Sequence, residues 1–191
     1  KGKTTAIVGA TGAGKSTLVK LLLRINEVTA GTISYSGTDI RSLSQQTIRQ
    51  VISYVPQKAF LFSGTILSNL LMGNAKATTE EIRTALEISQ SSEFIDSLPQ
   101  GIESFVAQGG SNYSGGQKQR MCIARALIKP ADVYIFDDSF SALDYKTDAA
   151  LRAALHAQMS DKTLLIVAQR LSTIMNADNI IVLDEGRIVG Q

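Results

Sequence analysis

The chain has 191 residues, of which 44% are apolar and 19% charged, and this composition excludes a disordered or fibrous protein. The net charge is +2, and the lysines and arginines are scattered, which gives no electrostatic case for a nucleic-acid partner. The single cysteine, Cys122, excludes a disulfide framework, and no apolar run has the length of a membrane span, so we expect one soluble globular domain.

The first predicted element is a short buried strand at residues 5–8, and a helix with an apolar side follows Gly14. The loop between them has the pattern G-x-x-x-x-G-K-[ST] of a phosphate-binding loop. Its backbone amides and the helix N-terminus favour phosphate, so we expect a nucleoside triphosphate here. Lys15 is expected to reach the β- and γ-phosphates, and the Ser16 hydroxyl to ligate Mg²⁺. The expected nucleotide-binding residues are Gly9, Thr11, Gly12, Ala13, Gly14, Lys15, Ser16 and Thr17.

Further strands are predicted at residues 32–35, 51–55, 133–136, 164–168 and 180–183. Further helices are predicted at residues 65–71, 79–90, 114–129 and 147–159, and Thr78 with Glu81 forms a capping box for the second of these. Continuous apolar runs favour strands that are buried on both faces of a parallel sheet. We therefore predict an α/β fold of the P-loop NTPase type, with a doubly wound, mostly parallel sheet and an inserted helical subdomain. The expected boundaries are about 1–61 and 130–191 for a RecA-like core and 62–129 for the helical subdomain.

Two carboxylates, Asp137 and Asp138, directly follow the apolar run at residues 133–136. Ligands of open α/β sheets bind beyond the carboxyl ends of the strands, so Asp137 is expected to hold Mg²⁺ through water. A solvated acidic turn is the alternative, and the phosphate-binding loop upstream makes it the weaker one.

A second glycine-containing stretch opens the helix predicted at residues 114–129. Ser114 and Gln117 form a capping box, but capping does not explain Gly115 and Gly116, which weaken the first turn. Two glycines make sense if another phosphate approaches this helix N-terminus closely. Because this stretch lies far along the chain from Lys15, it indicates a site that is completed across a dimer.

Together these segments resemble the nucleotide-binding domain of an ABC (ATP-binding cassette) transporter over nearly the whole chain. Residues 9–17 resemble its Walker A loop, residues 133–138 its Walker B strand and residues 114–117 its signature motif. Gln57 resembles the Q-loop glutamine, which touches Mg²⁺ and faces the membrane domains. Asp144, in Ser141-Ala142-Leu143-Asp144, resembles the D-loop aspartate.

Residues 61–66, with Asn69 and Gly73, are similar to the exporter branch of this family. The resemblance implies ATP and Mg²⁺ as ligands, with Ser16, Gln57 and Asp137 at the metal, and ATP hydrolysis that powers export. It also implies two partners, the transmembrane domains and a second nucleotide-binding domain that closes head to tail. Its location would be the cytoplasmic face of the cell membrane. The chain begins and ends abruptly, so we interpret it as a piece of a longer polypeptide, or as an ordered core of one.

Two positions depart from the family pattern. Asp138 stands where the family has a catalytic glutamate, and a carboxylate misplaced on the ångström scale costs on the order of 100-fold in rate. Gln169 stands where the family has a switch histidine, and glutamine carries neither a proton nor a positive charge near neutral pH. We therefore expect a degenerate site in a heterodimer, with Asp138, Gln169 and Gln57 as its catalytic residues and residues 114–117 completing the partner's site.

Other interpretations stay open beside this one. One is that Asp138 is a tolerated variant in a slower but sound site. Another is that the domain is a non-hydrolysing clamp that dimerises on ATP, and a third is that it is a soluble ATPase of the same superfamily. The remaining reactive side chains are expected to be unremarkable in role: His156 at the surface, and Cys122 in the core without cationic neighbours.

Overall fold

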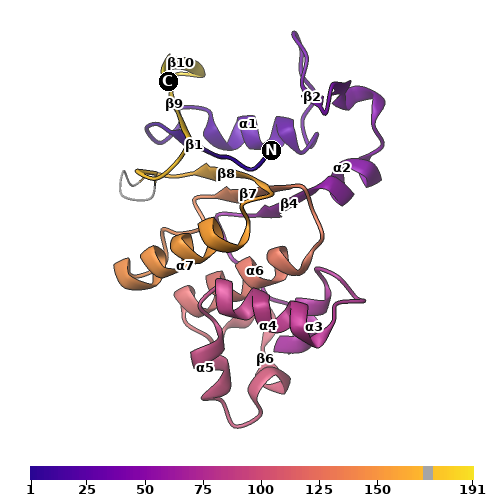
Figure 1. Cartoon of the computed structure of the whole chain (residues 1–191), viewed down its shortest axis with the longest axis vertical. Coiled ribbons are helices and arrows are strands. Elements are labelled where there is room, and N and C mark those ends of the chain that lie inside the picture. The colour runs from indigo at the N-terminus through magenta and orange to yellow at the C-terminus, as the bar shows by residue number, and fades with distance from the viewer. Residues whose placement is uncertain (170–173) are drawn as a thin grey trace.

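The computed structural model describes residues 1–169 and 174–191, and a six-stranded sheet forms its centre (Figure 1). The strand order is β10-β9-β1-β8-β7-β4. The strands are β1 (Thr4–Val8), β4 (Ile52–Val55), β7 (Val133–Asp137), β8 (Thr163–Val167), β9 (Asn179–Asp184) and β10 (Arg187–Gly190). All neighbours pair in parallel except β10, which pairs antiparallel with β9. The predicted α/β fold with a mostly parallel sheet is confirmed.

Helices cover both faces of this sheet, with α1 (Lys15–Leu22) on one face and α6 (Gly115–Ile128) and α7 (Tyr145–Gln158) on the other (Figure 1). Side chains alternate along each strand, so Ile7 and Ile135 pack with α1 in one buried cluster. Ala6 and Phe136 belong to the larger cluster on the opposite face. The central strands therefore read as continuous apolar runs, because both of their faces are buried.

A group of helices lies against α6 on the side away from the sheet (Figure 1). Its elements are α3 (Ile66–Leu71), α4 (Thr79–Ile88), α5 (Ser92–Asp96) and the 3₁₀ helices η2 (Gly101–Glu103) and η3 (Gln108–Gly110). Two short strands, β5 (Gly64–Thr65) and β6 (Phe105–Val106), pair antiparallel beside them. One buried cluster runs from the sheet into these helices, and the division at residues 62 and 129 stays a prediction. Among the helices in the described part of the chain, none has the length and apolarity to cross a membrane.

The region between α1 and β4 differs from the prediction. The strand predicted at residues 32–35 is reduced to β2 (Ser34–Tyr35), which pairs with β3 (Thr38–Asp39) in a separate two-stranded sheet. A 3₁₀ helix, η1 (Ile40–Ser42), and α2 (Gln45–Val51) follow. Ile48 is the only buried residue of α2, so this helix lacks the apolar periodicity by which sequence analysis finds a helix.

The starts of three other helices follow from their caps. The capping box of Thr78 and Glu81 is confirmed at the start of α4, and that of Ser114 and Gln117 at the start of α6. The helix predicted from residue 147 begins two residues earlier, because the Asp144 side chain is its N-cap.

Candidate nucleotide-binding site

A cavity of about 220 Å³ lies at the carboxyl ends of the central strands. It brings together most of the site residues that the sequence predicts, from the loop after β1, from the ends of β7 and β8 and from the segment after β4. Its lining residues are Thr11, Gly12, Gly14, Lys15, Ser16, Thr17, Gln57, Asp137, Asp138, Val167 and Gln169.

The loop after β1 adopts a conformation that depends on its glycines. Gly12 has φ of 88° and Gly14 has φ of 100°, both in the left-handed region that favours glycine. Gly14 is the N-cap of α1 and offers no side-chain acceptor, which leaves the first amide groups of the helix for a ligand. A Cβ on Gly9 would lie 2.2 Å from the Leu183 carbonyl oxygen, so Gly9 allows the loop to pass close to β9.

Two of the predicted nucleotide-binding residues do not line the cavity. Ala13 is buried in the cluster on the α1 face of the sheet. Gly9 contributes its carbonyl oxygen, which accepts a hydrogen bond of 2.6 Å from Lys15 Nζ. The same ammonium donates to the Ala10 carbonyl oxygen at 2.8 Å, so Lys15 is held within the loop at the cavity wall.

Asp137 is a buried carboxylate at the end of β7, with 5% of its surface exposed. The Tyr54 hydroxyl donates a hydrogen bond of 3.2 Å to its Oδ2 atom. Burial raises the pKa of Asp137, and the hydrogen bonds from Tyr54 and Ser16 oppose that rise. Burial and the nearby Asp137 raise the pKa of Tyr54 to about 12, so Tyr54 remains a hydrogen-bond donor near neutral pH.

Asp138 has different surroundings from those of Asp137. Its backbone has φ of 48°, in the left-handed region, which aspartate tolerates better than most residues. Its Oδ2 atom accepts hydrogen bonds from Gln57 Nε2 at 3.1 Å and from Gln169 Nε2 at 3.2 Å. The two predicted catalytic glutamines therefore meet at one carboxylate oxygen, which they hold with two neutral amide donors.

The predicted signature and D-loop residues lie elsewhere, because none of Ser114, Gly115, Gly116, Gln117 and Asp144 lines this cavity. A Cβ on Gly115 would have no atom of the described residues within 4 Å, whereas one on Gly116 would lie 3.3 Å from the Ala142 carbonyl oxygen. Close packing against Ala142 thus explains why position 116 is a glycine, and the sequence did not predict this contact. Asp144 accepts hydrogen bonds from the Thr147 amide at 3.0 Å and the Thr147 hydroxyl at 2.7 Å, as the cap of α7.

The residues at this cavity fit Mg²⁺. Ser16 and Asp137 both line it, and hydroxyl and carboxylate oxygens are the hard ligands that Mg²⁺ prefers. Within residues 1–169 and 174–191, no group of three or more His, Cys, Asp or Glu side chains could hold a metal alone. In general, Mg²⁺ is bound through one or two protein carboxylates together with water and substrate phosphates.

The comparison with protein families decides the class of this site. A family model described as ABC transporter matches residues 1–141. The chain belongs to the ABC transporter family. ABC domains bind ATP, generally with Mg²⁺, and the predicted enzyme class, an ATP hydrolase of the ABC transporter type, is confirmed at the level of the family.

Individual relatives of the ABC domain agree. It is 46% identical to an uncharacterized ABC transporter ATP-binding protein of Mycobacterium bovis, over 99% of this chain and 33% of that protein. It is 44% identical to an ATP-dependent lipid A-core flippase of Methylococcus capsulatus, over 98% of this chain and 31% of that protein. A solved structure of a bacterial Atm1-family ABC exporter with ATP bound is 40% identical, with a TM-score of 0.95, over 99% of this chain and 33% of that one. The chain thus spans about a third of the length of these relatives.

Two details of the ABC domain differ from the sequence analysis or were missed by it. Arg125 Nη2 lies 3.5 Å from the Cys122 Sγ atom, so the expectation that Cys122 lacks a cationic neighbour is wrong, although burial still raises its pKa. The contact of Tyr54 with Asp137 was not predicted from the sequence, because it depends on the pairing of β4 with β7, which are far apart along the chain. His156 is exposed, as expected.

Proposed function

We propose that this ABC domain binds ATP with Mg²⁺ in the cavity at the ends of β1, β7 and β8, and that it powers export by a longer membrane transporter. The observation that carries the proposal is the convergence of the glycine loop, Asp137, Asp138, Gln57 and Gln169 on one cavity. The similarity to exporters over nearly the whole chain supports the direction of transport.

Each lining residue has a task in this proposal. The amides of Gly12, Gly14 and the first turn of α1 bind phosphate oxygens, and Lys15 exchanges its two loop carbonyls for phosphate. Ser16 and Asp137 hold Mg²⁺, with Gln57 close to it. When bound, Mg²⁺ neutralises the charge that develops on the phosphates.

Asp138 is proposed to orient the attacking water, and hydrolysis at this site is proposed to be slow. Its side chain is one methylene shorter than a glutamate, and two amides already occupy its Oδ2 atom. Gln169 donates a hydrogen bond but cannot carry a proton or a positive charge near neutral pH. Both features weaken hydrolysis and leave the phosphate-binding groups unchanged.

The second proposed partner is another nucleotide-binding domain, in a head-to-tail heterodimer. Residues 114–117 open α6 at a position that does not line the chain's own cavity, and Gly115 leaves space for a close approach. We propose that they contact the ATP held by the partner's Walker A loop, with Asp144 nearby. The complex would then contain one degenerate site, at the Walker A loop of this chain, and one competent site, at the Walker A loop of the partner.

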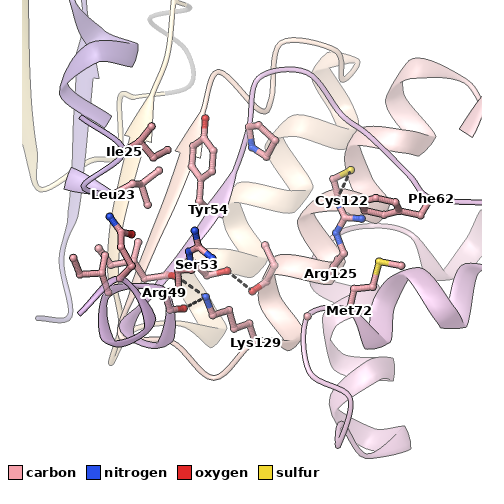
Figure 2. A pocket seen from close by; sticks show the side chains of 16 residues that line it. Leu23, Ile25, Arg49, Ser53, Tyr54, Phe62, Met72, Cys122, Arg125 and Lys129 are labelled. Carbon is pink, nitrogen blue, oxygen red and sulfur yellow. Dashed lines mark hydrogen bonds between the residues drawn. The ribbon is translucent and has the colours of Figure 1, made fainter. Parts of the chain in front are cut away.

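The first proposed partner, the transmembrane domains, contacts a groove of about 370 Å³ that reaches Pro56, next to Gln57. Figure 2 shows Leu23 and Ile25 on one side of this groove and Phe62 and Met72 on the other. Three cations also line it, Arg49, Arg125 and Lys129, and none of its described lining residues is acidic. These features suit an apolar segment with acidic side chains. We propose that this contact lies at the cytoplasmic face of the membrane.

A non-hydrolysing ATP-dependent clamp is the second candidate, because both amide donors on Asp138 are compatible with a site that only binds. The test is ATP turnover by the complete transporter before and after the double change Asp138→Glu with Gln169→His. The catalytic carboxylate of the partner's site is neutralised in both proteins, so that only this site reports.

Turnover is expected to rise by about 10- to 100-fold, because the longer carboxylate corrects an ångström-scale misplacement. No rise, with ATP still bound, would favour the clamp.

A further inference from the structure

Tyr54 lies between two sites, the groove next to Gln57 and the nucleotide cavity, which have no described lining residue in common. Its ring lines the groove next to Gln57, between Leu23 and Cys122 in the view of Figure 2. Its hydroxyl donates to Asp137, which lines the nucleotide cavity. Tyr54 itself does not line that cavity, so it approaches Asp137 from outside it.

The register of the sheet explains this contact. Tyr54 on β4 lies opposite Ile135 on β7, and Asp137 is two residues further along β7. Side chains two residues apart in a strand point to the same face, so Ile135 and Asp137 both lie on the side of Tyr54. Tyr54 packs against the cluster of Ile7, Val19 and Ile135, and this packing directs its hydroxyl along the strand to the carboxylate.

The other groups that act on Asp137 have a different position. Ser16 and Lys15 both line the cavity, and both are proposed to engage Mg²⁺ or phosphate when the nucleotide binds. Tyr54 donates to Asp137 from outside the cavity lining, so its hydroxyl is not among the groups proposed to bind the nucleotide. A carboxylate that is only 5% exposed needs such a donor to fix its orientation.

We infer that Tyr54 is a positioning residue for Mg²⁺, because its hydroxyl holds the Asp137 carboxylate from the side of the groove. The inference rests on the proposed function, in which Asp137 is a ligand of Mg²⁺. Partners that orient a metal-binding side chain from outside are worth about 10- to 100-fold in metal affinity. The site's affinity for Mg²⁺ therefore depends on a side chain that also forms the wall of the groove.

The test uses Tyr54→Phe in the complete transporter, since phenylalanine keeps the ring in the groove and removes only the hydroxyl. Photo-cross-linking with azido-ATP is read on this chain, after separation of the subunits, over a range of Mg²⁺ concentrations and in EDTA. The Mg²⁺ concentration for half-maximal labelling is expected to rise about 10-fold. Labelling in EDTA is expected to stay unchanged, which a general structural defect would not allow.

Tyr134→Phe is the matched control, because Tyr134 also lies in a strand of the six-stranded sheet and its hydroxyl donates at 2.7 Å to the Lys129 carbonyl oxygen, outside the cavity. In an Asp137→Ala background, Tyr54→Phe should have no further effect on the Mg²⁺ dependence. The inference about Tyr54, but not the proposed function, would be overturned if Tyr54→Phe left the Mg²⁺ dependence unchanged. It would also be overturned if labelling in EDTA fell as much as labelling in Mg²⁺. Absence of Mg²⁺-dependent labelling in the unaltered transporter would instead overturn the proposed function.

Discussion

At the scale of single residues, Asp137 and Asp138 are neighbours with separate environments. Asp137 is enclosed and bonded to a tyrosine hydroxyl, whereas Asp138 has a left-handed backbone and two amide donors on one oxygen. Aspartate is favoured over glutamate at positive φ, and Gln57 and Gln169 reach the shorter side chain where it stands. Asp138 and Gln169 therefore fit each other, which is why the test of the proposed function changes both together.

A buried ion pair gives a prediction at the same scale. Asp148 is 1% exposed and accepts from Arg152 Nε at 3.1 Å and from Arg152 Nη2 at 3.3 Å. Asp148→Asn should lower the free energy of unfolding by about 2 kcal/mol, because it leaves the guanidinium without its charged partner. Thermal unfolding measures the loss. The control is Glu80→Gln, in the exposed pair with Arg83, and equal shifts in both variants would contradict the prediction.

At the scale of elements, the sequence predicts what is encoded locally. The strands β1, β7, β8 and β9 are apolar runs because both of their faces are covered, and the glycine loop and the caps are short-range patterns. The helices α2 and α5 were missed because each buries one residue, Ile48 and Ile95, which leaves no period to read.

The candidate site divides in the same way. Its motif residues were predicted from their own neighbours in sequence, so the glycine loop, Asp137, Asp138, Gln57 and Gln169 could be named in advance. The hydrogen bond between Tyr54 and Asp137, by contrast, joins residues that are 83 positions apart in the sequence. It depends on the register of β4 against β7, which no local pattern specifies.

The start of α6 gives a prediction for an element. A Cβ at Gly115 would have no atom of the described residues within 4 Å, so we expect a small side chain to be accommodated there. Gly115→Asp should lower ATP turnover at the partner's site about 10-fold or more, because its charge repels the phosphate proposed to approach this helix N-terminus. Gly115→Asn, which has the same size and no charge, is the control. Turnover that falls equally in both variants would show that bulk, not charge, matters there.

At the scale of the whole molecule, the groove lies where the sheet meets the helical part. Residues from the end of α1, from α2, from β4 and from α6 line it together, and Met72 adds a contact from the end of α3 (Figure 2). A partner segment in this groove would therefore touch elements of both parts at once. Because β4 leads directly to Gln57, the same strand would carry that contact toward the nucleotide cavity.

The charge of the groove gives the prediction at this scale. Arg49 is exposed in α2 and lines the groove, but it does not line the nucleotide cavity. Arg49→Glu should lower transport by the complete protein about 10-fold, because like charges that meet at an interface oppose association. Azido-ATP labelling of this chain should stay unchanged. Lys20→Glu, at an exposed cation of α1 outside the groove, is the matched control. If both variants reduced transport equally, net charge would explain the loss; if only Arg49→Glu reduced it while nucleotide binding persisted, the partner of this groove would be acidic and required for coupling.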